Sequence, residues 1–305
     1  MRDILVGAGL QEVITYSMGN LSAYAKLTPG GPEPSPDDHI RLANPLTPER
    51  EFLRRTLMSH LLETVRDNLR FRERIAIFEI GRVYWPREDN VLPEEPRHLC
   101  VAVTGPRVIR SWLSSDAESL DFFDLKGIVE TLVSRLNLAD VAIAPADHPT
   151  FHPGRSATLS VSGVKVGVFG EVHSDVCGAY DVEGQRVCLA EFNLEYLLAT
   201  AGQPVQVRPV SLYPAVYEDL AIIVDERVPA VQVRDLIVQT GGPMLRTVEL
   251  FDVYRGEQIG DSRKSLAYAL TYQADDRTLD AKTIARLRRK IVRHLERELG
   301  AMLRA

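Results

Sequence analysis

The chain has 305 residues, a length typical of two or three domains, which excludes a single small module. Hydrophobic residues make up 45% and charged residues 26%, so the chain can form a sizeable core and wholesale disorder is excluded. It carries 36 Lys or Arg against 42 Asp or Glu, a net charge of -6. Any nucleic-acid contact must therefore come from a local basic patch.

The three cysteines, Cys100, Cys177 and Cys188, form no C-x-x-C pair. Their odd number and spacing support neither a disulfide framework nor a cysteine-rich zinc site, which fits a reducing cytoplasm. No apolar run approaches ~18–20 residues, and the first residues lack an apolar stretch of signal-peptide length. We therefore expect neither export nor a membrane span.

The first 200 residues mix patterns typical of strands and of helices. The stretch 28–38 holds four prolines and two glycines, so it predicts a mobile loop. Helices are predicted at 2–9, 56–69 and 123–136, and strands at 12–17, 75–84, 99–104, 157–161, 164–169 and 188–192. A Ser162-Gly163 turn joins two of these strands. The pattern predicts an antiparallel sheet with helices packed against it.

The polar, proline-bearing segment 200–209 marks a domain boundary, which gives domains 1–203 and 207–305. Beyond it, strands are predicted at 220–224, 248–254, 265–272 and 302–304, and helices at 231–240 and 281–299. This order of strands and helices is that of the split βαβ, or ferredoxin-like, α/β sandwich.

The last predicted helix concentrates positive charge. Its cations recur at helical spacing on one side, and the candidates for contacts with successive phosphates are Arg286, Arg289, Lys290 and Arg293. A plain solvated helix face is the alternative. Tyr254 and Tyr268 lie on predicted strands and are candidates for stacking on unpaired bases, although strand alternation should bury about half of the tyrosines in this region.

No motif indicates catalysis or metal binding. His148 and His152 are four residues apart, but Pro149 and Pro153 argue against the helix that would bring them together on a metal. The G-x-S-x-G elbow and both common glycine-rich phosphate loops are missing from the sequence. We predict neither a catalytic residue nor a metal ligand.

Several strings, in order along the chain, resemble a known family: NPLTPEREFLRRTL, IFEIGRVY, DFFDLKGIVETL, FHPGRSA and GVFGEVH. They look like the catalytic-like module of the bacterial phenylalanyl-tRNA synthetase beta subunit. YPAVYEDLAIIVDE, LFDVYRGEQI and KSLAYALTYQADDRTL resemble its C-terminal ferredoxin-fold anticodon-binding domain. The resemblance implies a class II synthetase-like antiparallel sheet flanked by helices, followed by the ferredoxin-like domain.

Some residues depart from the family pattern. Family members are much longer, so the chain is either a C-terminal fragment or a naturally shortened relative. Glu218-Asp219 stands where the family tends to show arginine before aspartate, which puts an anion contact at position 218 in doubt. After the histidine of G-E-x-H the family usually has a proline, whereas this chain has Ser174. Trp85 follows IFEIGRVY, where an adenylate-forming site of this fold has an arginine.

The resemblance implies a non-catalytic subunit of an ATP-dependent ligase. The chain would support the alpha subunit in an α2β2 heterotetramer and bind tRNA(Phe) near its anticodon, in the cytoplasm, without DNA or a membrane as partner. It would hold no cofactor itself, since ATP and Mg²⁺ are used by the complete synthetase. Residues 56–69 and 12–17 are candidates for intersubunit packing, with plain internal core as the alternative.

Two other functions stay open. One is a single-chain synthetase with its own adenylation site, against which the missing arginines count. The other is a free-standing regulatory or interaction paralogue. Arg155, in FHPGRSA, either faces a partner or ligand or belongs to a tight structural turn.

Overall fold

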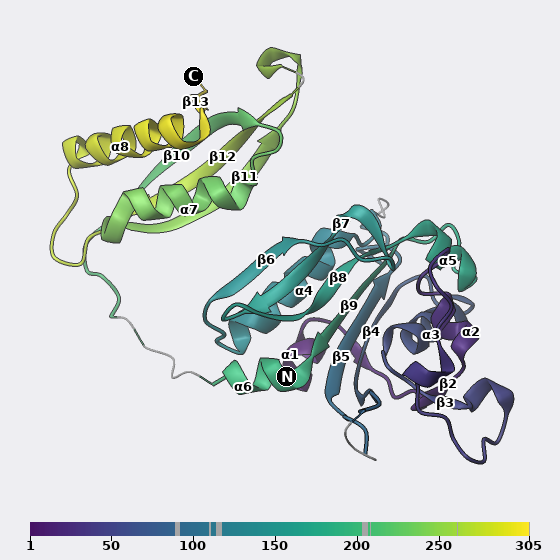
Figure 1. Cartoon of the computed structure of the whole chain (residues 1–305). Coiled ribbons are helices and arrows are strands. Elements are labelled where there is room, and N and C mark those ends of the chain that lie inside the picture. Colours follow the sequence, from purple (N-terminus) through teal and green to yellow (C-terminus); the bar gives the residue numbers. More distant parts are fainter. Residues whose placement is uncertain are drawn as a thin grey trace. The chain divides into compact units, whose positions relative to one another are not determined.

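The computed structural model describes residues 1–88, 92–109, 111–113, 118–202, 207, 209–260 and 262–304. The chain forms two compact units, Met1–Val205 and Gln206–Ala305, and each is described by itself (Figure 1). Residues 203–206, where the sequence places the domain boundary, lie outside the described residues.

The first unit is built on a seven-stranded sheet in the order β1-β4-β5-β9-β8-β7-β6. Neighbouring strands are antiparallel, except that β1 pairs parallel with β4. The strands are β1 (Gln11–Glu12), β4 (Ile75–Arg82), β5 (Arg97–Thr104), β6 (Val141–Pro145), β7 (Phe151–Val161), β8 (Val164–Val172) and β9 (Val187–Asn193). Two short strands, β2 (Met18–Gly19) and β3 (Phe52–Leu53), form a separate pair.

Helices pack on both faces of this sheet and give the unit three layers (Figure 1). One face shares its core with α1 (Arg2–Gly7), α4 (Phe122–Arg135) and α6 (Leu194–Thr200). The other is covered by α3 (Met58–Leu69) and α5 (Ser174–Ala179). The loops carry α2 (Leu21–Ala25) and the 3-10 turns η1 (Pro36–Asp38) and η2 (Pro48–Arg50). The antiparallel sheet flanked by helices that the sequence predicts is confirmed.

The interior strand β5 is a nearly continuous apolar run in the sequence because both of its faces are buried. Leu99, Val101 and Val103 point into the core shared with α4, whereas Cys100 and Ala102 point into the core shared with α3. A strand buried on both faces has no polar alternation. The residues that follow Arg97 in β5 are therefore nearly all buried.

The second unit has a four-stranded antiparallel sheet in the order β11-β12-β10-β13. Its elements, in chain order, are β10 (Val216–Asp225), α7 (Ala230–Gly241), η3 (Gly242–Met244), β11 (Leu245–Tyr254), η4 (Glu257–Ile259), β12 (Arg263–Tyr272), α8 (Ala281–Leu299) and β13 (Met302–Leu303). The two helices pack together on one face of the sheet (Figure 1). This is the predicted ferredoxin-like arrangement. Within the described residues, no helix combines the length and the apolar character needed to cross a membrane.

The strand predicted at 12–17 is wrong in length, because β1 ends at Glu12. The Val13 amide still donates to Phe78, but the chain then leaves the sheet edge. Side chains replace the strand ladder there: the Thr15 hydroxyl donates to Glu79 at 2.6 Å, and the Tyr16 carbonyl accepts from Arg54 at 3.3 Å. Local alternation carries no information about such long-range contacts.

The region around FHPGRSA is strand, not the tight turn considered from the sequence. β7 pairs with β8 at Phe151 and again from Ser156, with an irregularity between them. This irregularity contains Pro153, which cannot donate a ladder hydrogen bond, and Gly154, which has a φ of 76°. Strand β6 and the short helices α2, α5 and α6 were not predicted from the sequence.

The cysteines are all buried and free. Burial raises the pKa of Cys177 to about 11 and that of Cys188 to about 12. The pKa of Cys100 is raised well above its ordinary value, first by burial and then by the nearby Glu191 and Glu79 carboxylates. Thiols of this kind are packing residues.

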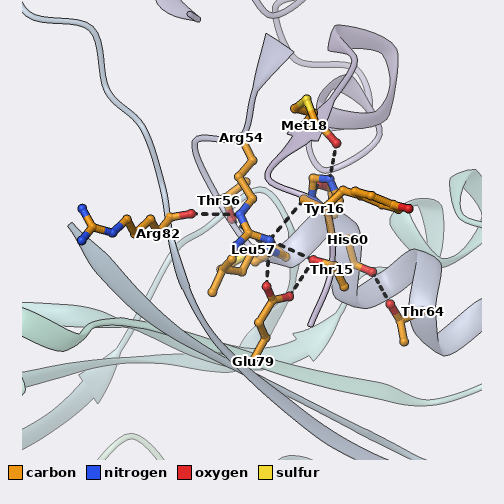
Figure 2. A network of polar contacts seen from close by, with 12 residues as sticks. Thr15, Tyr16, Met18, Arg54, Thr56, Leu57, His60, Thr64, Glu79 and Arg82 are labelled. Atoms are coloured by element: carbon orange, nitrogen blue, oxygen red, sulfur yellow. Dashed lines mark hydrogen bonds and ion pairs between the residues drawn. The ribbon is translucent and has the colours of Figure 1, made fainter. Parts of the chain in front are cut away.

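A buried ion pair fixes the segment before α3 to the sheet. Figure 2 shows the Arg54 guanidinium between Glu79 and the backbone of Arg82: Nη1 donates to Glu79 Oε1 at 2.9 Å, and Nε to the Arg82 carbonyl at 2.9 Å. Thr15 bridges the pair, because its hydroxyl accepts from Arg54 and donates to the other Glu79 oxygen. The side chains of Arg54 and Glu79 are only 3% and 2% exposed.

A second buried carboxylate holds the start of α3. Glu191, on β9, accepts from the Leu57 amide at 2.9 Å and from the Thr56 hydroxyl. His98 Nδ1 lies 2.9 Å from Glu191 Oε1. A carboxylate at a helix N-terminus satisfies free amides and complements the helix dipole. Residues 54–57 are therefore attached to β4 and to β9 at once.

We predict that removing one partner of the Arg54–Glu79 pair is strongly destabilising. Arg54→Met and Glu79→Gln should each lower the free energy of unfolding by about 3–5 kcal/mol, because each leaves a buried polar or charged group unpaired. Urea unfolding followed by tryptophan fluorescence measures this, since both tryptophans lie in the first unit. Lys126→Met, which breaks a surface pair with Glu130, is the control. Equal urea midpoints for Arg54→Met and the control would contradict the prediction.

Two glycines allow the energetic cost of a left-handed backbone to be measured separately from the cost of a steric clash. Gly163, with a φ of 78°, has open space where a Cβ would lie, whereas a Cβ on Gly105, with a φ of 92°, meets the Glu73 carbonyl. Gly163→Ala should therefore cost about 1–2 kcal/mol of folding free energy from the left-handed backbone alone. Gly105→Ala should cost clearly more, because two backbone segments must also separate. Urea midpoints compare the two variants. Equal losses of stability would contradict the predicted clash at Gly105.

Candidate nucleic-acid interface

The basic residues predicted to contact phosphates lie on α8, a helix with well-formed ends. The Asp280 side chain accepts from the Thr283 amide at 2.8 Å, and Gly300 closes the helix with a φ of 58°. Hydrogen bonds from the Thr283 side chain and backbone lower the pKa of Asp280. The apolar side chains of Ile284, Ile291 and Leu295 are buried against the sheet, which turns the charged side of the helix outward.

The four predicted cations come together in the structure. Arg286, Arg289, Lys290 and Arg293 are exposed, and with Thr240, His294 and Arg297 they line a groove of about 530 Å³. Positions three and four apart lie on one helix face, so these groups form a row. Arg286, Lys290 and Arg293 have no ion-pair partner within the described part of the chain. Such a row can contact successive phosphates of a nucleic acid.

Arg288 does not belong to this row. Its Nε lies 3.9 Å from Glu218, the residue at which the sequence departs from the family pattern. The Tyr272 ring is buried beside them, and its pKa is raised to about 12, mainly by burial and further by Glu218. The acidic residue at position 218 therefore faces a cation of its own chain and offers no anion contact.

The prediction that Tyr268 stacks on a base is wrong. Its ring is 1% exposed in the core beneath α7, and its hydroxyl donates to the Ala230 carbonyl at 2.7 Å. Burial raises the pKa of this phenol. Leu266 and Leu270 on the same strand are also buried, so the alternation of β12 places Tyr268 on the helix-covered face.

Tyr254 lies on the opposite face of the same sheet. It pairs with Ser265, which is out of phase with the core residues of β12. The Arg304 guanidinium stacks 4.6 Å from the centre of the Tyr254 ring. The structure therefore separates Tyr254 from the cationic groove, which lies on the helix side of the unit.

Two further rings of this unit are exposed to solvent. Tyr217 on β10 is 77% exposed, and Phe251 on β11 is 59% exposed. The alternation of Leu220, Ile222 and Val224 as core residues could have identified Tyr217 as outward-facing. Phe251 lies at an irregularity of β11 that shifts the register, and a sequence pattern gives no sign of it.

In the first unit, the residues considered for chemistry have structural contacts. Arg155 pairs with Glu171 at 2.7 Å. His148 is partly buried, and its pKa is lowered by that burial and by Lys165. Trp85 donates from Nε1 to the Arg55 carbonyl at 3.2 Å. Within the described residues, no three His, Cys, Asp or Glu side chains are close enough to hold a metal ion.

Comparison with known families assigns both units. Residues 1–194 match the phenylalanyl-tRNA synthetase beta chain CLM domain. Residues 211–304 match the ferredoxin-fold anticodon binding domain. Together the two matches account for nearly the whole chain.

Similar proteins agree with this assignment. The phenylalanine–tRNA ligase beta subunit of Symbiobacterium thermophilum is 40% identical over 306 residues, which cover 100% of this chain and 34% of that protein. The beta subunit of Clostridium acetobutylicum is 34% identical, with 99% of this chain and 37% of that protein covered. The chain thus spans little more than a third of the curated relatives' length.

A solved structure supports the fold. Pyrrolysyl-tRNA synthetase from Desulfitobacterium hafniense aligns with a TM-score of 0.50 at 18% identity, covering 65% of this chain and 66% of that one. This likeness confirms the synthetase-like fold expected from the sequence. The two domain matches and the relatives show that the chain belongs to the phenylalanyl-tRNA synthetase beta chain family.

Proposed function

We propose that this chain is a non-catalytic part of a phenylalanyl-tRNA synthetase beta subunit that binds tRNA(Phe) and supports the alpha subunit. The observation that carries the tRNA-binding role is the row of exposed cations on α8, in a domain of the anticodon-binding family. The complete enzyme would work in the cytoplasm as an α2β2 heterotetramer and use ATP and Mg²⁺. The role of this chain is to position other molecules.

The surroundings of β4 support a role without chemistry. In an adenylate-forming site of this fold, an arginine after this strand would offset the charge of the ATP phosphates. Here that position is Trp85, whose ring makes a T-shaped contact with the His98 ring at 5.4 Å between ring centres. An indole carries no positive charge for a phosphate. We therefore assign the activation of phenylalanine to the alpha subunit.

Removing one cation from α8 should weaken tRNA binding in a salt-dependent way. Arg293→Gln should reduce the affinity similarly for tRNA(Phe) and for a noncognate tRNA, and lower the slope of log K against log salt by about one, because one phosphate contact is lost. Filter binding at several salt concentrations measures both quantities.

Arg234→Gln is the matched control for this experiment, because Arg234 is an exposed arginine on α7 that pairs with Asp235 at 2.9 Å. The control should bind tRNA as the unchanged chain does. If both variants lost the same amount of tRNA affinity, the phosphate contact assigned to Arg293 would be wrong. If Arg293→Gln altered anticodon discrimination while the slope stayed constant, Arg293 would be a base-reading residue instead.

The segment that follows β1 is the candidate for the interface with the alpha subunit. Ile14 is 90% exposed and Tyr16 58% exposed, although both belong to a segment rich in β-formers. The apolar side chains of α3, the other sequence candidate, lie in the core of the unit. We therefore assign subunit packing to residues 13–17 rather than to α3.

Ile14→Ser should reduce the amount of alpha subunit of the same organism that co-purifies with the tagged chain. The side chain is almost fully exposed in the chain alone, so the loss would come from the interface and not from folding. Val164→Ser, which changes another exposed apolar residue in the same unit, is the control. Full retention of the alpha subunit by Ile14→Ser would exclude this edge from the interface.

A further inference from the structure

The first unit contains a pocket that the proposed function does not use. Its volume is about 570 Å³, within the range of small-molecule sites. The walls come from the proline-rich loop, the residues that precede α3, the segment that follows β4, and strands β8 and β9. These segments are far apart in the sequence, so the pocket exists only in the folded unit.

A buried polar atom on the pocket wall has no partner. His98 is 9% exposed, and its Nδ1 is engaged by Glu191. Its Nε2 is buried, and within the described residues it makes no hydrogen bond. An unsatisfied buried nitrogen is unfavourable and rare in folded proteins, so it marks a position where a ligand atom can complete the hydrogen bonding.

The wall of the pocket is positively charged. Arg55 and Lys165 reach it from the segment before α3 and from β8, and neither forms an ion pair within the described part of the chain. Glu191 is the carboxylate among the lining residues, and its oxygens already accept from Thr56, the Leu57 amide and His98. The two cations are therefore available to an anion.

Flat rings line the same pocket. The Trp85 ring makes a T-shaped contact with the His98 ring, and Tyr24 and Tyr196 contribute further aromatic surface. Aromatic walls favour a planar apolar group, and unpaired cations favour a carboxylate or phosphate. We propose that the pocket binds a small organic anion that joins a planar ring to a phosphate or carboxylate, with the ring against Trp85 and the anion at Arg55 and Lys165.

Trp85 reports binding directly. The chain has two tryptophans, and the other, Trp112, is 92% exposed. In a Trp112→Phe background, fluorescence therefore comes from the pocket wall alone. Titration with phenyl phosphate and with 3-phenylpropionate tests the two anionic groups. Inorganic phosphate and benzyl alcohol supply the anion and the ring separately.

We expect saturable quenching by at least one of the two aryl anions, and the tighter of them identifies the preferred anionic group. Inorganic phosphate and benzyl alcohol should bind at least about tenfold more weakly, because each loses half of the contacts. Absence of saturation by both aryl anions up to about 10 mM, a concentration that corresponds to negligible affinity, would overturn the proposal. Equal binding of benzyl alcohol would overturn it as well, because the cations would then play no part.

Charge removal tests the assigned cations. Arg55→Gln and Lys165→Gln should each raise the dissociation constant of the better aryl anion by about tenfold, because each removes a charge-assisted hydrogen bond. Lys126→Gln, at a partly exposed lysine of α4, is the matched control and should leave the dissociation constant unchanged. If a variant bound the anion as tightly as the control, the cation that it lacks would not belong to the site. Near-UV circular dichroism checks that each variant keeps its fold, and the titration involves neither tRNA nor the alpha subunit.

Discussion

The first unit depends on two buried carboxylates that must be satisfied at the same time. Glu79 on β4 and Glu191 on β9 both pair with Cys100 of the strand between them, so they lie in one row across the sheet. Residues 54–57 supply the partners of both: the Arg54 guanidinium for one, and the Thr56 hydroxyl and Leu57 amide for the other. Buried charge without such partners is strongly unfavourable. The position of α3 on the sheet follows from this requirement, and one wall of the pocket follows from α3.

The sequence predicts those elements whose signal is local. α8 matches its predicted range because its apolar stripe and both of its capping residues are visible in one continuous stretch of sequence. α4 is predicted well because its apolar residues recur at helical spacing. The strand at 12–17 was overestimated because its residues are β-formers that bond to distant side chains instead. β6 was missed because it is a short strand at the edge of the sheet, where it pairs with β7. Long-range pairing, and not propensity, decides these cases.

The same distinction applies to the candidate sites. The row of cations on α8 could be predicted because helical periodicity alone brings it together. Tyr268 was assigned wrongly although its phase with Leu266 and Leu270 contained the answer, whereas Phe251 depends on a shift of register that only the paired strands reveal. The pocket with Trp85, His98 and Lys165 draws on segments spread over more than a hundred residues. No local pattern indicates such a site.

The burial of all three cysteines has a practical consequence. Alkylating dyes react with thiolates, and the raised pKa values of these groups keep them protonated and shielded near neutral pH. A cysteine introduced at an exposed position, such as Glu130→Cys, therefore becomes the dominant attachment point for a maleimide fluorophore without removal of the native thiols. Because the native thiols are buried, a dye can be attached at a chosen position in each unit. Distances between the two units can then be measured in solution.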